Sequence, residues 1–140
     1  PLVPQHLGKL FVDFRLGSRV DVHATLVATG GSFARGNENN AHHPDGVYFL
    51  GAGRTAAYAV ATLGARIGVA AHLDVVAQVN NLFDRRYETA SLLGPVSISP
   101  DNRFVARPLP AVNGAFPLVH STYVAPGAPR RAWIGLRFRF

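Results

Sequence analysis

The 140-residue chain contains no cysteine and no methionine, and it has a single tryptophan. Without cysteine there are no disulfide bonds, no thiolate metal sites and no cysteine nucleophile. The chain does not begin with methionine, and no signal peptide with a charged start and an apolar stretch is present. We therefore expect that Pro1 is not the natural start, and that the chain is a fragment of a longer protein or a processed product.

Long apolar runs are also missing. No stretch approaches the roughly 18 apolar residues that indicate a membrane-spanning helix, and the mean hydropathy is only +0.12. This search does not find the strands of a membrane β-barrel, because every second residue of such a strand faces the lumen and lowers the mean hydropathy. The lack of a helix-type span therefore does not exclude a membrane.

Basic residues outnumber acidic ones, and the formal net charge is +6 with a pI of about 10.8. Lys9 is the only lysine, and the arginines are scattered or paired along the chain. Such a charge is compatible with nucleic acid, anionic lipid or lipopolysaccharide as a partner, and alone it selects none of them.

Five segments alternate apolar with polar residues at the period of two that is typical of β-strands. Each is about 9–11 residues long, which is the length that a tilted strand needs to cross a bilayer. The last segment has an apolar face that ends on Phe140, as expected for a strand with lipid on one side and a wet lumen on the other. The segments are residues 7–17, 20–29, 57–67, 72–81 and 132–140.

The connections between these segments alternate in length. The links around 17–19 and 68–71 are short, whereas 30–54 is a long polar stretch and 84–130 carries seven of the ten prolines. Short turns on one side and long loops on the other are typical of outer-membrane barrels, and loops of this length are uncommon in compact soluble sandwiches. We therefore predict an all-β fold, an antiparallel transmembrane β-barrel.

Five strands cannot close a membrane barrel, whose smallest examples have about eight, so the chain is expected to be part of a larger barrel or one protomer of an assembly.

Four short motifs occur in a fixed order along the chain. They are Val-Pro-Gln-His at 3–6, Arg-Gly-Asn-Glu-Asn-Asn at 35–40, Asn-Leu-Phe-Asp at 81–84 with Tyr87, and Pro-Gly-Ala-Pro-Arg at 126–130 before the terminal strand. In this order they resemble the "vP-x-h", "RG(D/N)E-x-N", "NLFD-x-x-Y" and "PG-x-PR" segments of TonB-dependent outer-membrane receptors. The resemblance covers essentially the whole chain, and the last two motifs with the terminal Phe140 are its most specific part.

The resemblance implies a fold and a function. Members of this family hold a plug domain inside a barrel of about 22 strands, and residues 1–140 would supply the last five strands and two extracellular loops. The intact receptor would sit in the outer membrane of a Gram-negative bacterium and use the TonB system to take up a scarce nutrient, most often a ferric siderophore. Its other partners would be lipid and lipopolysaccharide, the plug and the barrel-assembly machinery, with no nucleic acid. Leu136, Phe138 and Phe140 would form the terminal assembly signal.

The sequence offers no catalytic constellation, because no triad, phosphate-cradling loop or paired carboxylates emerge, and we expect neither an enzyme nor a cofactor. The predicted ligand contacts lie in the first long loop, where the same side chains are equally suited to closing the loop by local hydrogen bonds. His42 and His43 lack a carboxylate or cysteine at ligand spacing, so no metal site is predicted. The candidate ligand-binding residues are Arg35, Asn37, Glu38, Asn40, His42 and His43.

Structural roles are expected for the later motifs. Phe83 and Tyr87 suit the aromatic girdle of a barrel, and the Asn81 and Asp84 side chains suit bonds to the backbone where the chain leaves the strand. Leu82, Pro129 and Arg130 complete these structural motifs. Four arginines at the predicted outer rim are hypothesised to pair with lipopolysaccharide phosphates, with solvated rim charge as the alternative: Arg85, Arg86, Arg130 and Arg131.

Two further expectations concern charge. The alternation places most charged side chains on one face, and we predict cross-strand ion pairs of Asp13 with Arg15 and of Asp74 with Arg66. The alternative function, from a different class, is a small soluble β-domain that binds a polyanion through its arginines.

Overall fold

The computed structural model describes residues 2–37, 49–108 and 119–140. Within these ranges every regular element is a β-strand, and no helix is long and apolar enough to cross a membrane. The chain divides into two compact units, which are described separately. One unit contains residues 6–30, 57–87 and 127–140, and the other contains 1–5, 31–56 and 88–126.

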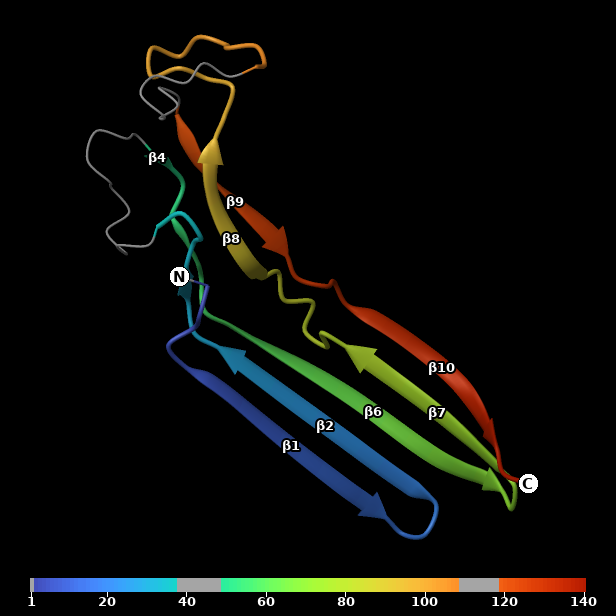
Figure 1. Cartoon of the computed structure of the whole chain (residues 1–140). Coiled ribbons are helices and arrows are strands. Elements are labelled where there is room, and N and C mark those ends of the chain that lie inside the picture. The colour runs from blue at the N-terminus through green and yellow to red at the C-terminus, as the bar shows by residue number, and fades with distance from the viewer. Residues whose placement is uncertain (1, 38–48, 109–118) are drawn as a thin grey trace. The chain divides into compact units, whose positions relative to one another are not determined.

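The first of these units is a five-stranded antiparallel sheet with the strand order β1-β2-β6-β7-β10 (Figure 1). All five strands predicted from the alternation are present. In the part of the chain that the structure describes, β1 and β10 are the edges and the sheet is open. The strands are β1 (Leu7–Leu16), β2 (Val20–Thr29), β6 (Tyr58–Ala70), β7 (Leu73–Asn80) and β10 (Arg131–Phe138).

Two short turns join neighbouring strands at one end of this sheet (Figure 1). Gly17 opens the turn between β1 and β2 with a φ of 64°, a left-handed conformation that glycine adopts without strain. The second turn is shorter than the sequence predicts, because β6 continues to Ala70 through a register shift after Gly68. The Gly68 N–H donates to the Arg19 carbonyl at 2.7 Å. This bond extends the β2–β6 ladder beyond its last pair, Val20 and Ile67.

The four ladders of the sheet are in a register that keeps apolar residues in shared rows. One row runs Phe14, Val22, Ala65, Ala77 and Ile134 across all five strands. Because side chains alternate between the two faces of a sheet, this register collects every second residue on one side. We call this set the apolar face: Leu10, Val12, Phe14, Leu16, Val20, Val22, Ala24, Leu26, Ala28, Ala59, Ala61, Leu63, Ala65, Ile67, Leu73, Val75, Ala77, Val79, Ala132, Ile134, Leu136 and Phe138.

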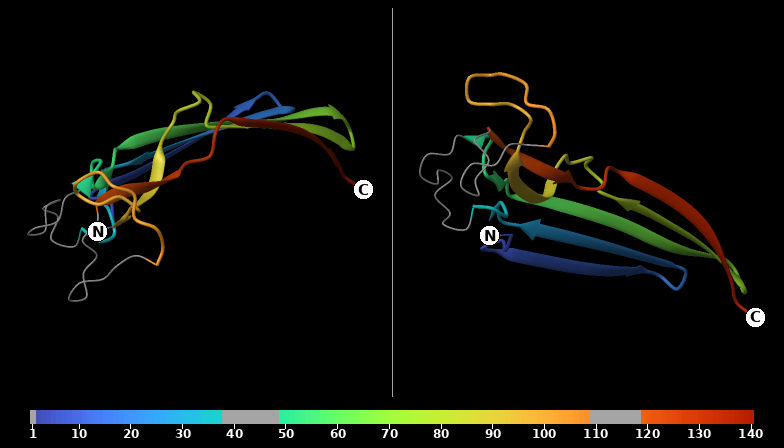
Figure 2. Two further views of the ribbon diagram at one scale, coloured as in Figure 1. Left: turned by 90° about the horizontal axis from the view of Figure 1, so that it is seen from above. Right: turned by 45° about the horizontal axis from the view of Figure 1, so that its top comes forward.

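The apolar face is not covered by another part of its unit, which forms a single layer of strands (Figure 2). Ile134 is 75% exposed, and none of the 22 residues belongs to the buried core. The opposite side, which we call the mixed face, carries charged and polar side chains together with a few apolar ones such as Phe11 and Trp133. The sheet is therefore amphipathic across its whole width.

Within its described residues, the second unit contains five strands that the sequence prediction treated as loop. A short core of Ala34, Leu93 and Val119 is buried in this unit. Its longest strands, β8 and β9, pair antiparallel, and each ends on a proline, Pro95 or Pro126. Proline is tolerated at strand ends but not within a central ladder, so a proline-rich segment was compatible with strands. The bounds are β3 (Ser32–Phe33), β4 (Phe49–Leu50), β5 (Arg54–Thr55), β8 (Glu88–Pro95) and β9 (His120–Pro126).

Candidate functional site

The predicted ligand-binding residues are only partly within the described structure. Arg35 and Asn37 are described, whereas Glu38, Asn40, His42 and His43 lie outside the described residues. Arg35 is exposed, and its backbone forms a bridge to β8: its N–H donates to the Ser91 carbonyl at 3.0 Å, and its carbonyl accepts from the Leu93 N–H at 2.8 Å.

Asn37 has a clear local structural role. It is buried, and its Nδ2 donates to the carbonyl of Gly53 at 3.3 Å while its N–H donates to the carbonyl of Ala34 at 3.1 Å. Gly36 lies against Leu93 with a φ of 91°, where a Cβ would come within 3.2 Å of the Leu93 Cβ. These contacts correspond to the local closure that the sequence offered as the alternative to ligand contact. Binding of a chelate by Arg35 and its neighbours stays a prediction.

Asn81 organises the end of β7. It adopts a positive φ of 50°, and its buried side chain makes three hydrogen bonds. Its Nδ2 donates to the carbonyls of Arg85 at 2.9 Å and Ala128 at 3.0 Å, and its Oδ1 accepts from the Arg85 N–H at 2.8 Å. The predicted bond of Asn81 to the local backbone is confirmed, and the bond to Ala128 also ties β7 to the segment before β10.

Asp84 and Tyr87 strengthen the same junction. The Asp84 carboxylate accepts from the Arg130 N–H at 3.1 Å, and the Tyr87 carbonyl accepts from the Gly127 N–H at 2.8 Å. The Tyr87 ring lies so close to Gly127 that a Cβ there would come within 2.2 Å of it, and it packs on Tyr58 at a centroid distance of 4.4 Å. We call this set of contacts the β7–β10 clasp: Asn81, Asp84 and Tyr87 with Gly127, Ala128 and Arg130.

The clasp joins two motifs that the sequence singled out separately. Their pairing was missed, although one motif directly follows β7 and the other directly precedes β10, its antiparallel neighbour. Strands that pair in this way bring the end of one beside the start of the other, so the signal was present.

Comparison with protein-family models, curated proteins and solved structures gave no match. The resemblance to a family therefore stays a prediction from the residues of the chain itself.

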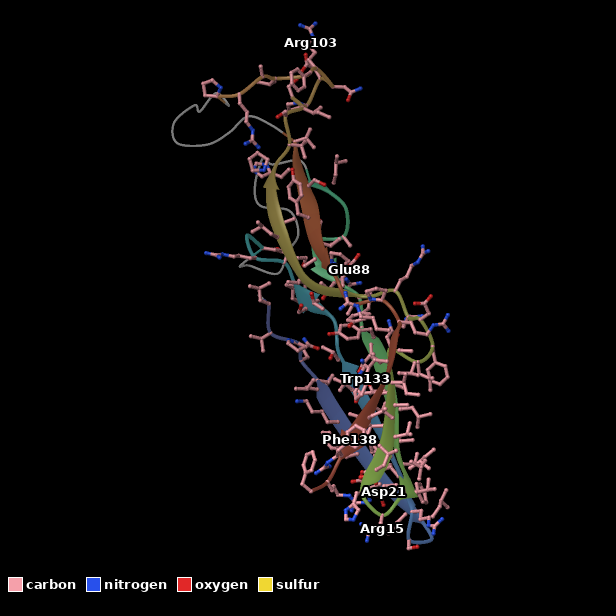
Figure 3. All side chains as sticks on the ribbon, turned by 90° about the vertical axis from the view of Figure 1, so that its right-hand side faces the viewer. Arg15, Asp21, Glu88, Arg103, Trp133 and Phe138 are labelled. Carbon is pink, nitrogen blue, oxygen red and sulfur yellow. The ribbon has the colours of Figure 1, made fainter. Side chains whose placement is uncertain are left out.

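Charged side chains form a continuous row across the mixed face, near the short turns. Arg15 donates to Asp21 at 2.9 Å, Arg66 bonds both Asp21 and Asp74, and Arg139 donates to Asp74 at 3.0 Å. The charges alternate in sign from β1 to the residue after β10, so each carboxylate lies between two guanidinium groups. Arg15 and Asp21 mark one end of this row beside the β1–β2 turn (Figure 3).

One of the two predicted ion pairs is confirmed and the other is wrong. Asp74 pairs with Arg66 at 3.3 Å, but Arg15 pairs with Asp21 and not with Asp13. Asp21 is the direct cross-strand partner of Arg15, and such partners have Cβ atoms about 5 Å apart. Asp13 is two residues from Arg15 on the same strand, roughly 7 Å along its axis, so the cross-strand partner lies closer.

Replacing Asp74 with Asn is expected to weaken this row. Asp74 is fully buried and accepts from two arginines that are 33% and 49% exposed, so the remaining cations still reach water when the carboxylate is lost. We expect a loss of about 1–2 kcal/mol in the free energy of unfolding, measured by urea titration in detergent micelles. Asp101→Asn, which removes an exposed pair with Arg103, is the matched control and should change the stability by less than about 0.5 kcal/mol. Equal effects of the two substitutions would contradict the structural role of the row.

The remaining residues that the sequence singled out belong to the unit that contains the five-stranded sheet. Phe83 is 77% exposed, Leu82 donates its N–H to the Ala61 carbonyl, and Pro129 lies within the clasp segment. Arg85, Arg86, Arg130 and Arg131 are exposed, and Leu136, Phe138 and Phe140 are exposed on or after β10. Among the described residues, no group of three histidine or carboxylate side chains could hold a metal ion.

Proposed function

We propose that this chain forms the C-terminal part of the barrel of a TonB-dependent outer-membrane receptor, and that the receptor takes up a scarce nutrient such as a ferric siderophore. The observation that carries the proposal is the register of the five-stranded sheet, which aligns 22 apolar residues on one face. In water such a face is an aggregation surface. In a bilayer it is the surface that faces lipid.

The mixed face supports the same proposal. A barrel of this size has a polar interior, and the row from Arg15 to Arg139 supplies charges that are paired with one another. The edges β1 and β10 carry unpaired backbone groups in the described structure, and lipid provides no hydrogen bonds for them. Pairing with further strands of the same receptor would satisfy these groups.

The alternative, a soluble β-domain that binds a polyanion, is less compatible with the ion pairs that the arginines form. Arg15, Arg66, Arg103 and Arg139 already pair with carboxylates, and such pairs reduce the positive field available to a polyanion. A soluble domain would also need to cover the apolar face, because contiguous exposed patches of this kind are rare on soluble monomers.

Extraction of the full-length protein separates the two functions. A barrel should stay in the membrane fraction through high-salt and alkaline washes, and it should be released only by detergent. In mild detergent it should migrate faster on gels before boiling than after it, because the closed barrel resists unfolding. Release by salt alone, with binding to nucleic acid that weakens steeply with salt, would favour the soluble polyanion binder.

A further inference from the structure

The apolar face has a hollow at the end of the sheet away from the short turns. Gly8, Ala28 and Ala59 are direct cross-strand neighbours on β1, β2 and β6, so three small residues lie in one row. The next row toward the turns contains Leu10 and Leu26, whose larger side chains form a step. A groove of about 620 Å³ lies over the small-residue row.

The groove combines an apolar floor with the guanidinium-bearing side chain of Arg85. Gly8, Ala28 and Ala59 line it together with the Phe83 ring, and Arg85 and His6 also line it. The floor is open at Gly8, where a Cβ would meet no atom within 4 Å. Apolar surface beside a cation at the edge of a lipid-facing sheet fits a molecule that is itself apolar at one end and anionic at the other.

Arg85 is held in place by the clasp. Its N–H donates to Asn81 Oδ1 at 2.8 Å, and its carbonyl accepts from Asn81 Nδ2 at 2.9 Å, so its backbone is fixed on both sides. Within the part of the chain that the structure describes, the Arg85 guanidinium has no carboxylate partner. A guanidinium without a carboxylate partner, on a backbone held in this way, is suited to bidentate bonds with a phosphate.

We propose that this groove binds one anionic lipid, with an acyl chain on the floor of Gly8, Ala28 and Ala59 and the lipid phosphate on Arg85. The inference rests on the proposed membrane location of the apolar face and adds to it a specific site. The rest of the apolar face carries no charge and contacts bulk lipid without preference for the headgroup. The groove would select the headgroup because Arg85 lines it beside the apolar floor.

The test uses photocrosslinking in the full-length protein, reconstituted in vesicles of equimolar phosphatidylglycerol and phosphatidylcholine. The phenylalanine analogue p-benzoylphenylalanine replaces Phe83, and in a second variant it replaces Ile134, which lies on the apolar face away from the groove. At position 83 we expect about a fivefold preference for phosphatidylglycerol adducts, the effect of one arginine beside an anionic lipid. At position 134 we expect adducts of both lipids in equal amounts.

Substitutions assign the preference to the groove. Arg85→Gln should abolish the preference at position 83, and Arg85→Lys should retain only part of it, because lysine keeps the charge but not the bidentate fork. Arg103→Gln, in the other unit, should leave it unchanged. Gly8→Leu should reduce the total lipid adduct at position 83 by filling the floor, without affecting adducts at position 134. Heat-dependent gel mobility verifies that each variant is folded.

Two outcomes would overturn the inference in distinguishable ways. Equal adducts of both lipids at positions 83 and 134 would leave the membrane proposal standing and remove the specific site. No lipid adduct at either position in a folded protein would remove the membrane proposal together with the site.

Discussion

Replacing Ile134 with Arg is expected to cost roughly 2–4 kcal/mol in folding into lipid vesicles, the cost of an arginine at the middle of a bilayer. Ile134 lies midway along the edge strand β10, in the row with Ala77 and Ala65, and is 75% exposed. The free energy of unfolding, measured by urea titration of the full-length protein in vesicles, gives the cost directly. A fall in the fraction with fast gel mobility before boiling gives a second readout.

The matched control is the neighbouring residue on the other face. Trp133 lies opposite Gln78 on the mixed face and is 49% exposed, so in the proposed barrel Trp133→Arg would place the same charge in the lumen instead of in lipid. We expect this substitution to cost less than half as much as Ile134→Arg. On a soluble domain both sites are simply exposed, and the two arginines would have similar, small effects. That similarity would argue against the membrane proposal and for the soluble alternative.

Replacing Asn81 with Ala is expected to cost about 3–4 kcal/mol and to loosen the junction of β7 and β10. The substitution removes three hydrogen bonds of a buried side chain, each contributing about 1 kcal/mol. It also places alanine at a φ of 50°, a left-handed conformation that asparagine tolerates better than alanine, at a further cost of about 1 kcal/mol. The urea midpoint in detergent micelles measures the sum.

Three variants separate the contributions. Asn81→Gly removes the hydrogen bonds but adopts the left-handed backbone freely, so it should cost about 1 kcal/mol less than Asn81→Ala. Asn81→Asp keeps the acceptor for the Arg85 N–H and loses both donor bonds. Asn102 also has a positive φ, 63°, but is exposed, so Asn102→Ala should show the backbone cost alone. If Asn81→Ala were no more costly than Asn102→Ala, the clasp would contribute nothing to stability.

The five-stranded sheet could be predicted from the sequence because its pattern is local. Alternation with a period of two specifies which residues share a face, and a slip by one residue would move the whole apolar set to the wrong side. The glycine at position 17 marked the first turn in the same local way. Strand limits agree with the structure to within a few residues, and the largest difference is at β6, where the strand continues through a register shift past Gly68 to Ala70.

What the sequence did not reveal depends on contacts between distant residues. The β8–β9 pair joins Leu93 to Thr122 across a long insertion, and no periodic signal announces a partner that far along the chain. The clasp likewise joins Asn81 to Ala128. The choice of Asp21 over Asp13 as the partner of Arg15 needed the register of β1 and β2, which alternation alone does not fix. Local rules gave the faces, and long-range pairing decided which side chains meet.

The alternating row of charges has a consequence for assembly. A shift of β2 by two residues against β1 would preserve the apolar face, yet it would bring Arg15 opposite His23 or Arg19 instead of Asp21. A similar shift of β6 would bring Arg66 away from Asp21 and opposite Arg19 or His23. A misaligned hairpin would thus lose ion pairs or bring like charges together, and so be less stable. Contacts of the apolar face would not distinguish it from the correct register. During assembly the row of ion pairs would therefore disfavour register shifts by two residues, which the apolar face alone would permit.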